Sequence, residues 1–254
     1  MYGFDGRVRY SEVDGGGLLR PDMLINYFQD CSTFQSEDGG VGIRYMLGQG
    51  AAWIVNYWQI DIRRYPALGE RVVVGTSPYE LRGFLGLRNF VMDTPEGERL
   101  AIANSVWSLL DLNRLVPVRA TQKMVEVFEL HDKLDMEYLP RKIAVPKQGG
   151  ELLDSIVVDR GHIDSNRHVN NGQYVRFAVE RIPPEELVTG LRVEYRRQAF
   201  IGDTMQFVQY VREPERSGDP GIRTITMGTP DGALYAAAEL RVRRRTEREQ
   251  DAWL

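Results

Sequence analysis

Hydrophobic and polar residues recur along this chain with two different periods, and each period predicts a different kind of element. From about Asn171 to Arg181 the apolar residues Tyr174, Phe177 and Ala178 fall at i, i+3 and i+4, which predicts a helix with one apolar face. A second helix is predicted from about Arg20 to Phe34, where the apolar residues are spaced less regularly. After each helix the period changes to two, which is typical of strands that are buried on one side.

The sequence also repeats itself, with three matched segments in the same order in each half. Such an order predicts a duplication, in which each copy has one helix followed by a mostly antiparallel sheet with Gly-containing hairpin turns. The expected fold class is therefore α+β. The matched segments are Asp14 with Asp164, I-D-I-R-R at 60–64 with V-E-Y-R-R at 193–197, and T-P-E-G at 94–97 with T-P-D-G at 229–232.

The repeat divides the 254 residues into two units. We expect an N-terminal unit over residues 1–120, a connector over residues 121–153 and a C-terminal unit over residues 154–254. The connector is polar and contains prolines and a Gly-Gly pair. Because each unit has only one helix to cover its sheet, we expect the two units to pack as one body.

Composition excludes several classes of protein. Hydrophobic residues make up 43% and charged residues 27%, as in globular proteins, and the net charge of −4 gives no electrostatic case for nucleic-acid binding. The single cysteine, Cys31, excludes an internal disulfide framework and is expected to be a small core residue. Three histidines and the lack of a phosphate-binding loop predict no metal and no cofactor. Without a signal peptide or a long apolar run, a cytoplasmic protein that does not bind membranes is expected.

The richest cluster of polar residues lies just before the helix of the second copy. Asp164, Asn166 and His168 are spaced i, i+2 and i+4, so in an extended segment their side chains share one face. An imidazole, an amide and a carboxylate beside a helix N-terminus could polarise a carbonyl group and position water. The alternative is a polar turn whose histidine bonds to the backbone and whose Asn170 or Asn171 caps the helix.

Only one copy of the repeat carries this cluster. Where the second copy has Asn166 and His168, the first has Gly16 and Leu18. A purely structural turn would need the same residues in both copies. The difference favours chemistry in the second copy and predicts a single site at the interface of the two copies.

These residues resemble the acyl-acyl-carrier-protein (acyl-ACP) thioesterases of plants and bacteria, which are built as a tandem pair of hot-dog folds. Residues 164–171 reproduce the family motif D-x-N-x-H-V-N-N, and residues 191–199 resemble its second signature. R-R-Y-P at 63–66 and S-V-W at 105–107 also resemble family features, so the resemblance runs from about Val8 to Arg243. It implies a double hot-dog fold, in which each unit wraps a long helix in an antiparallel β-sheet.

The resemblance implies hydrolysis of a fatty acyl-ACP thioester, which releases the free fatty acid and terminates fatty acid synthesis. It also implies that His168 and Asn166 bind and polarise the thioester carbonyl or the attacking water, and that Asp164 orients them. Many relatives have a glutamate where this chain has Gln198 and a cysteine where it has Ala199. The implied partner is an acyl carrier protein that carries a fatty acyl-phosphopantetheine.

Gln198 leaves the identity of the general base open. A glutamine cannot accept a proton at neutral pH, although its amide oxygen can hold a water molecule. Either His168 is the base and Gln198 positions the water, or Glu194 is the base, because positions 194, 196 and 198 share one face if the strand is regular. Glu194 could equally be the partner of a nearby arginine. Ala199 argues against a cysteine nucleophile, so direct attack by water is expected.

The choice of partner rests on surface and pocket features. An acidic carrier protein predicts a basic docking face, although exposed arginines can equally protect strand edges. We expect the acyl pocket in the N-terminal unit, near residues 23–34 and 53–58, in a monomer or homodimer. An acyl-CoA thioesterase of the same fold and a non-catalytic acyl-binding hot-dog protein are the alternatives. The docking candidates are Arg63, Arg64, Arg196, Arg197, Arg241, Arg243, Arg244 and Arg245.

Overall fold

The computed structural model describes residues 1–164, 166–216 and 219–250. It contains two compact units, which are described separately. The first unit comprises Met1–Tyr10 and Asn26–Leu139, and the second comprises Ser11–Ile25 and Pro140–Leu254. The division passes through the first helix, α1, and it assigns one part of the predicted connector to each unit.

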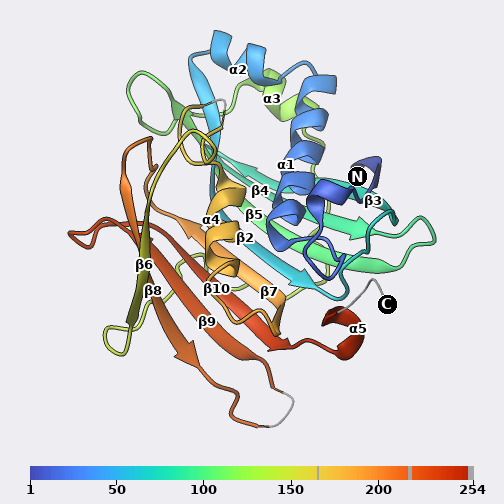
Figure 1. Ribbon diagram of the computed structural model, residues 1–254. Coiled ribbons are helices and arrows are strands. Elements are labelled where there is room, and N and C mark those ends of the chain that lie inside the picture. The colour runs from blue at the N-terminus through green and yellow to red at the C-terminus, as the bar shows by residue number, and fades with distance from the viewer. Residues whose placement is uncertain (165, 217–218, 251–254) are drawn as a thin grey trace. The chain divides into compact units, whose positions relative to one another are not determined.

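The first unit is an antiparallel sheet in the strand order β1-β3-β4-β5-β2, with α1 across one face (Figure 1). Helix α1 begins at Pro21, as proline at the first helical position favours, and it runs four residues further than the predicted end. The unit also contains two short helices, α2 before β2 and α3 after β5. The elements are β1 Tyr2–Arg7, a 3₁₀ turn Tyr10–Glu12 at the unit boundary, α1 Pro21–Asp38, α2 Ile43–Gly48, β2 Ala51–Ile62, β3 Arg71–Arg82, β4 Leu85–Asp93, β5 Arg99–Asp111 and α3 Gln122–Val127.

Aromatic side chains hold α1 against this sheet. The ring of Phe28 on α1 lies 6.1 Å from that of Trp58 on β2 and 5.3 Å from that of Phe90 on β4, measured between ring centroids. All three side chains are fully buried. Burying three large rings in mutual contact supplies much of the apolar area that stabilises the unit.

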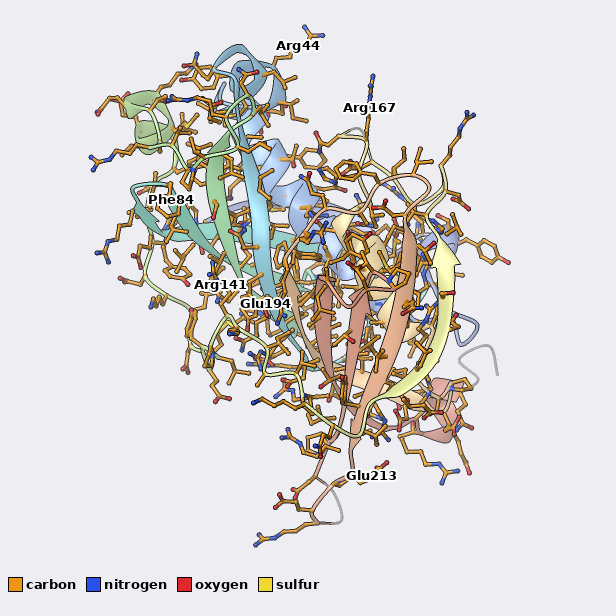
Figure 2. The ribbon with its side chains drawn as sticks, turned by 90° about the vertical axis from the view of Figure 1, so that its left-hand side faces the viewer. Arg44, Phe84, Arg141, Arg167, Glu194 and Glu213 are labelled. Carbon is orange, nitrogen blue, oxygen red and sulfur yellow. The ribbon has the colours of Figure 1, made fainter. Side chains whose placement is uncertain are left out.

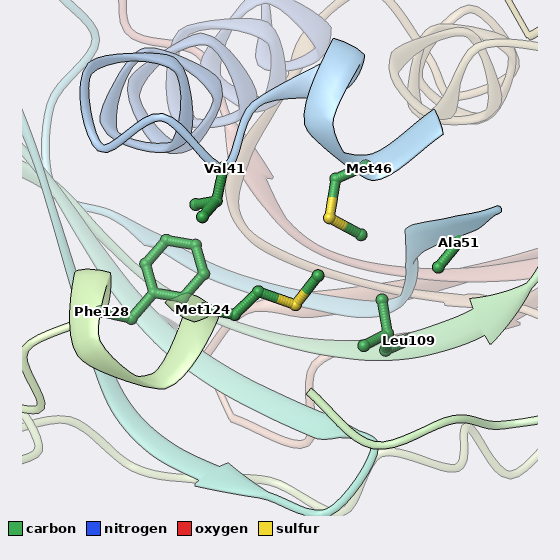
Figure 3. Close-up of a cluster of buried hydrophobic side chains, with 6 residues drawn as sticks. All are labelled: Val41, Met46, Ala51, Leu109, Met124 and Phe128. Atoms are coloured by element: carbon green, nitrogen blue, oxygen red, sulfur yellow. The ribbon is translucent and has the colours of Figure 1, made fainter. Parts of the chain in front are cut away.

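A second cluster of apolar side chains ties α2 and α3 to the ends of β2 and β5 (Figure 3). Thr121 caps α3, since its hydroxyl accepts a hydrogen bond from the N–H of Met124 at 3.3 Å. The start of the predicted connector is therefore an ordered helix with its own buried contacts. The cluster consists of Val41, Met46, Ala51, Leu109, Met124 and Phe128.

The chain after α3 is held to the sheet by two buried amide side chains. Asn89 accepts hydrogen bonds from the N–H of Leu134 and the hydroxyl of Tyr138, at 3.2 and 3.0 Å. Gln59 donates to the carbonyl of Glu137 and accepts from the N–H of Leu139. These amides satisfy backbone groups that no strand partner reaches, so this segment has a fixed path without regular secondary structure.

The second unit repeats the plan with a shorter helix, α4, across a sheet in the order β7-β10-β9-β8-β6 (Figure 1). Phe177 of α4 contacts Phe207 of β8 at 5.9 Å, and Tyr174 contacts Tyr195 of β7 at 5.6 Å, between ring centroids. The helix begins at the predicted residue and ends two residues earlier than predicted. The elements are β6 Glu151–Val157, α4 Asn171–Val179, β7 Glu186–Tyr195, β8 Thr204–Arg212, β9 Gly221–Gly228, β10 Leu234–Arg244 and α5 Glu247–Gln250.

The duplication is confirmed by backbone hydrogen bonds that recur at matched positions. Each pair joins the same places in the two copies, and the distances agree within a few tenths of an ångström. The pairs are Asp14 N–H to Leu18 O (2.8 Å) with Asp164 N–H to His168 O (3.0 Å), Arg63 N–H to Leu100 O (2.9 Å) with Arg196 N–H to Tyr235 O (2.8 Å), and Gly97 N–H to Thr94 O (2.9 Å) with Gly232 N–H to Thr229 O (2.9 Å).

One matched position differs in residue type but not in backbone conformation. Gly17 has φ +76°, and its counterpart Arg167 has φ +66°. A left-handed conformation is unstrained for glycine and unfavourable for arginine, because the Cβ atom crowds the backbone. The Arg167 side chain projects outward from the turn (Figure 2). The turn geometry is therefore set by the surrounding hydrogen bonds, and not by the preference of Arg167.

Arg167→Gly should therefore raise the free energy of unfolding by about 1 kcal/mol, because it relieves the left-handed strain. At the matched position, Gly17→Ala adds a Cβ atom to a left-handed residue and should lower the free energy of unfolding by about 1 kcal/mol or more. Urea unfolding monitored by circular dichroism measures both values. If the two substitutions shift stability in the same direction, strain does not distinguish these positions.

Candidate functional site

The motif that begins at Asp164 folds as a tight turn rather than an extended segment. The N–H of Asp164 donates to the carbonyl of His168 at 3.0 Å, and Ile163 pairs with Val169 in an isolated antiparallel bridge. The side chain of Asp164 accepts a hydrogen bond from the N–H of Asn166 at 2.8 Å. The prediction that alternate side chains share the face of a strand is therefore wrong here. The turn itself brings Asp164 and His168 together; Ser165 lies outside the described residues.

The carboxylate of Asp164 and the imidazole of His168 face each other inside this turn. Their Oδ1 and Nδ1 atoms are 3.8 Å apart, and the side chains are 18% and 15% exposed. This distance is too long for a hydrogen bond but within the range of an ion pair when the imidazole is protonated. Among the described residues no other cation lies within ion-pair distance of Asp164. Its negative charge is thus available to stabilise a protonated His168.

The matched turn of the first copy uses its aspartate differently. Asp14 accepts hydrogen bonds from the N–H groups of Gly16 and Leu18, and its Oδ2 atom binds Nη2 of Arg245 at 2.7 Å. That carboxylate is neutralised by a guanidinium, and the turn presents no imidazole. The two turns share a backbone, but only the second leaves its carboxylate facing an acid–base group.

Asn170 caps the helix α4, as the alternative interpretation of the motif predicted. Its Oδ1 atom accepts the N–H of Gly172 at 2.8 Å and so caps α4. The carbonyl of Asn171 accepts the hydroxyl of Tyr195 at 2.9 Å. The helix start is therefore fixed independently of Asp164 and His168, so the cap and the facing carboxylate and imidazole are separate parts of the motif.

Gln198 lies on a loop that its neighbour Ala199 attaches both to the motif and to α4. Ala199 accepts the N–H of Val169 at 2.9 Å through its carbonyl, and its own N–H donates to the hydroxyl of Tyr174 at 3.3 Å. The backbone bond between Val169 and Ala199 joins the residues that directly follow His168 and Gln198. The side chain of Gln198 is exposed, whereas Ala199 is fully buried. Position 199 thus holds a fully buried alanine, which offers no nucleophilic side chain.

Strand β7 ends at Tyr195, so the regular strand on which the argument for Glu194 depended stops before Gln198. Glu194 accepts hydrogen bonds from Nη2 of Arg196 at 2.8 Å and from the N–H of Ile143 at 3.0 Å, both through Oε2. One oxygen of this carboxylate is therefore occupied by two donors within its own unit.

Several arginines of the predicted docking face are neutralised by carboxylates. Arg64 binds both Glu70 and Glu98, and these contacts raise the pKa of its guanidinium. Arg196 binds Glu194, as described above. These charges hold the local structure, which leaves less of the predicted face free for a partner. The remaining paired candidates are Arg243 with Glu249 and Arg245 with Asp14.

Other chemistries find little support in the described residues. The thiol of Cys31 is fully buried, as expected for a core residue, and burial raises its pKa to about 12, so it is protonated at neutral pH. Within the described ranges no three His, Cys, Asp or Glu side chains gather as metal ligands would. None of the described helices is both long and apolar enough to cross a membrane.

Sequence reasoning missed the tyrosines that position the site. Tyr174 was counted only as part of the apolar face of its helix, yet its hydroxyl also holds the Gln198 loop. Burial raises the pKa of Tyr195, whose hydroxyl donates to the start of the same helix. A tyrosine in an apolar stripe, in place of phenylalanine, is the signal that a buried hydroxyl needs a partner.

Comparison with known proteins supports the family suggested by the motifs. Residues 3–128 match the acyl-ACP thioesterase N-terminal domain family. The acyl-[acyl-carrier-protein] hydrolase FATB3 of Cuphea viscosissima is 27% identical over 246 residues, which cover 90% of this chain and 59% of the relative. The oleoyl-acyl carrier protein thioesterase of Coriandrum sativum is 26% identical and covers 92% of this chain and 68% of its own. The chain thus spans little more than half the length of the FATB3 relative.

Solved structures show the same fold at low sequence identity. A putative oleoyl thioesterase from Lactobacillus plantarum superposes with a TM-score of 0.88 at 22% identity, covering 97% of both chains. The 12:0-ACP thioesterase from Umbellularia californica gives 0.83 at 17% identity, covering 96% of this chain and 94% of the other. The predicted double hot-dog fold is therefore confirmed. Residues 3–128 match the acyl-ACP thioesterase N-terminal domain model, and the chain as a whole is similar in sequence and fold to acyl-ACP thioesterases.

Proposed function

We propose that this protein hydrolyses the thioester of a fatty acyl-ACP and releases the free fatty acid, which ends elongation of that acyl chain. One observation carries the proposal: of two turns with the same backbone hydrogen bonds, only the second pairs a carboxylate with an imidazole. The relatives named as acyl-ACP hydrolases and thioesterases support the same activity.

His168 is the proposed general base. Its Nδ1 atom lies 3.4 Å from the carbonyl of Val169 and 3.8 Å from Asp164. With Nδ1 turned toward these oxygens, Nε2 is the nitrogen left to take a proton from a water molecule. Asp164 stabilises the imidazolium that forms, and the exposed amide of Asn166 binds the thioester carbonyl, whose oxygen gains negative charge as water attacks.

Gln198 is proposed to orient the attacking water without accepting its proton. Its amide oxygen is a hydrogen-bond acceptor at every pH of interest, and its loop is fixed to the motif through Ala199. The carboxylate of Glu194 is held by Arg196 and Ile143, which favours His168 as the base. The reaction is then a direct hydrolysis: water adds to the carbonyl carbon, the C–S bond breaks, and the proton held by His168 passes to the leaving thiolate.

The division of roles between the units is also proposed. The C-terminal unit, residues 154–254, would supply catalysis, and the N-terminal unit, residues 1–120, would bind the acyl chain. The carrier would be an acyl carrier protein with its phosphopantetheine arm. The relatives named above from plants are chloroplastic by name, and a cytoplasmic location for this chain stays a prediction, as does a monomer or homodimer.

His168→Ala should lower kcat for acyl-ACP hydrolysis by about 10²- to 10⁴-fold, the contribution of a well-placed acid–base group. His131→Ala, which removes an imidazole from the segment after α3 in the first unit, is the matched control and should leave kcat unchanged. Thiol release from acyl-ACP substrates of several chain lengths measures both. Equal activity of the two variants would contradict the assignment of His168.

The carrier is tested by comparing acyl-ACP with acyl-CoA of the same acyl chain. We expect kcat/KM to be higher for acyl-ACP by tenfold or more, because the carrier protein adds contacts that coenzyme A lacks. His168→Ala should abolish hydrolysis of both, since the same thioester is cleaved. A preference for acyl-CoA would leave the hydrolase in place and reassign its carrier.

The two candidate bases are separated by paired substitutions. Glu194→Gln keeps an acceptor for Arg196 and Ile143, and it should change kcat by less than about threefold if Glu194 is structural. Gln198→Ala removes the proposed water ligand and should lower kcat by about tenfold or more. If instead Glu194→Gln costs the 10²-fold or more typical of a lost base, Glu194 is the base.

A further inference from the structure

Two short segments of the first unit expose aliphatic side chains: residues 43–50, which contain α2, and residues 112–119, which follow β5. In α2 the side chain of Met46 packs into the apolar cluster beneath the helix (Figure 3), whereas Ile43 and Leu47 are 58% and 61% exposed. Single exposed leucines are ordinary on a protein surface, but a group of large aliphatic side chains marks an interaction site. The group, called the aliphatic patch below, consists of Ile43, Leu47, Leu112, Leu115 and Val116.

Hydrogen bonds hold the two segments beside each other on a fixed backbone. The N–H of Leu112 donates to the carbonyl of Gly50 at 2.8 Å, so the second segment starts where the first ends. The hydroxyl groups of Tyr45 and Thr121 lie 3.0 Å apart and connect α2 to the start of α3. The exposed side chains therefore belong to one surface, and packing beneath it fixes their positions.

Leu115 is held in a backbone conformation that leucine disfavours. Its φ is +53°, in the left-handed region, and its side chain is 73% exposed. Hydrogen bonds from the N–H of Leu115 to the carbonyl of Asp111, and from the N–H of Asp111 to the carbonyl of Val116, set this turn. Glycine would relieve the strain and remove apolar surface from water. A residue that is unfavourable in both respects points to a role outside the fold.

The aliphatic patch is accompanied by positive charge. The two segments contain Arg44, Arg114 and Arg119 and no acidic residue, in a chain whose net charge is −4. All three arginines are exposed, and none has an ion-pair partner in the described parts of the chain. Arg44 projects away from α2 (Figure 2). The flanking carboxylates of Glu37 and Asp111 accept backbone N–H groups of the two segments.

This combination fits a lipid surface better than a protein partner. A second copy of the chain would bring two sets of unpaired arginines together, which is repulsive. The cores of protein interfaces are enriched in aromatic side chains, whereas every residue of the aliphatic patch is aliphatic. At a bilayer, aliphatic side chains enter the boundary between head groups and acyl chains, while arginines beside them bind the phosphate groups.

We propose that the aliphatic patch and its three arginines bind the surface of an anionic lipid bilayer, with Leu47 and Leu115 inserted among the head groups. The prediction that this chain does not bind membranes rested on the lack of a long apolar run. A surface assembled from two short segments contains no such run, so the sequence pattern does not reveal it. The contact uses none of the residues of the proposed hydrolysis and does not depend on that activity.

The test is co-sedimentation of the full chain with vesicles of two compositions, phosphatidylcholine alone and phosphatidylcholine with one third phosphatidylglycerol. We expect binding to the anionic vesicles to be about 10- to 100-fold stronger, because each arginine near the charged surface contributes. Since the whole chain is negatively charged, its net charge cannot produce this preference. Salt at about 1 M should remove most of it, because charges are then screened beyond about 3 Å.

Leu47→Ser and Leu115→Gly should each weaken binding to the anionic vesicles about tenfold, as the loss of a partly inserted leucine does. Leu115→Gly also relieves the left-handed strain, so urea unfolding should show stability that is unchanged or raised. Leu152→Ser is the matched control, because Leu152 on β6 of the second unit is 61% exposed, as Leu47 is. It should bind as the wild-type chain does.

The charge contribution is tested separately. The double variant Arg44→Gln, Arg114→Gln should lose most of the preference for anionic over neutral vesicles. Arg212→Gln removes an exposed arginine at the end of β8 and should keep the preference. Far-UV circular dichroism establishes that each variant is folded.

The proposal is overturned if the wild-type chain binds anionic vesicles no better than neutral ones, or if the folded leucine variants bind as tightly as the wild-type chain. Two other occupants would also overturn it. A raised KM for acyl-ACP in these variants with unchanged vesicle binding would assign the aliphatic patch to the carrier protein. Loss of a dimer in sedimentation velocity with unchanged vesicle binding would assign it to a second copy of the chain.

The lipid contact and the hydrolase fail in different ways. His168→Ala should bind vesicles as the wild-type chain does while it loses hydrolysis. Vesicle binding without any hydrolysis of acyl-ACP by the wild-type chain would contradict the proposed function and keep the lipid contact. Hydrolysis without vesicle binding would do the reverse.

Discussion

The arrangement of the candidate site depends on the two backbone hydrogen bonds of Ala199. Its carbonyl binds the residue after His168, and its N–H binds the hydroxyl of Tyr174 on α4. The turn, the loop that carries Gln198 and the helix are thereby held by one buried residue. Moving any of them would leave a buried polar group without a partner, which costs about 1–3 kcal/mol. The side chains that carry the proposed chemistry are thus placed by main-chain geometry, so their own identities can vary while the frame persists.

Much of the fold could be predicted from the helical and strand periods of the hydrophobic residues and from the internal repeat. The i, i+3, i+4 spacing placed the start of α4, and the repeated Thr-Pro-acid-Gly turns placed two hairpins. The candidate site was harder to predict, because it is built where periodicity ends. Residues 164–168 turn back on themselves, which requires a positive φ at Arg167 that no preference of arginine encodes; the glycine at the matched position 17 was the available signal. Likewise the alternation through Glu194 gave no sign that the strand ends at Tyr195.

The two units use buried polar groups for different purposes. In the second unit nearly every strong donor described above meets an acceptor of the same chain, as Arg223 does with Glu186. In the first unit, amides such as Asn89 and Gln59 fix a segment of chain, while the indole N–H of Trp58 is buried without a hydrogen-bond partner among the described residues. Satisfied networks rigidify a structure, and unsatisfied buried donors mark places where a ligand contributes more than packing. After the duplication the copies have therefore diverged in their interiors as well as in their turns.

The ion pair between Asp14 and Arg245 joins residues 231 positions apart in the chain and makes the C-terminal segment part of the first copy's turn. Arg245 also donates to the carbonyl of Glu249, while the carboxylate of Glu249 binds Arg243 and Thr246. The residues that follow β10 thus hold the turn that begins at Asp14. A chain cut before residue 245 would therefore leave the carboxylate of Asp14 without its guanidinium partner, so the last strand stabilises a turn near the start of the chain.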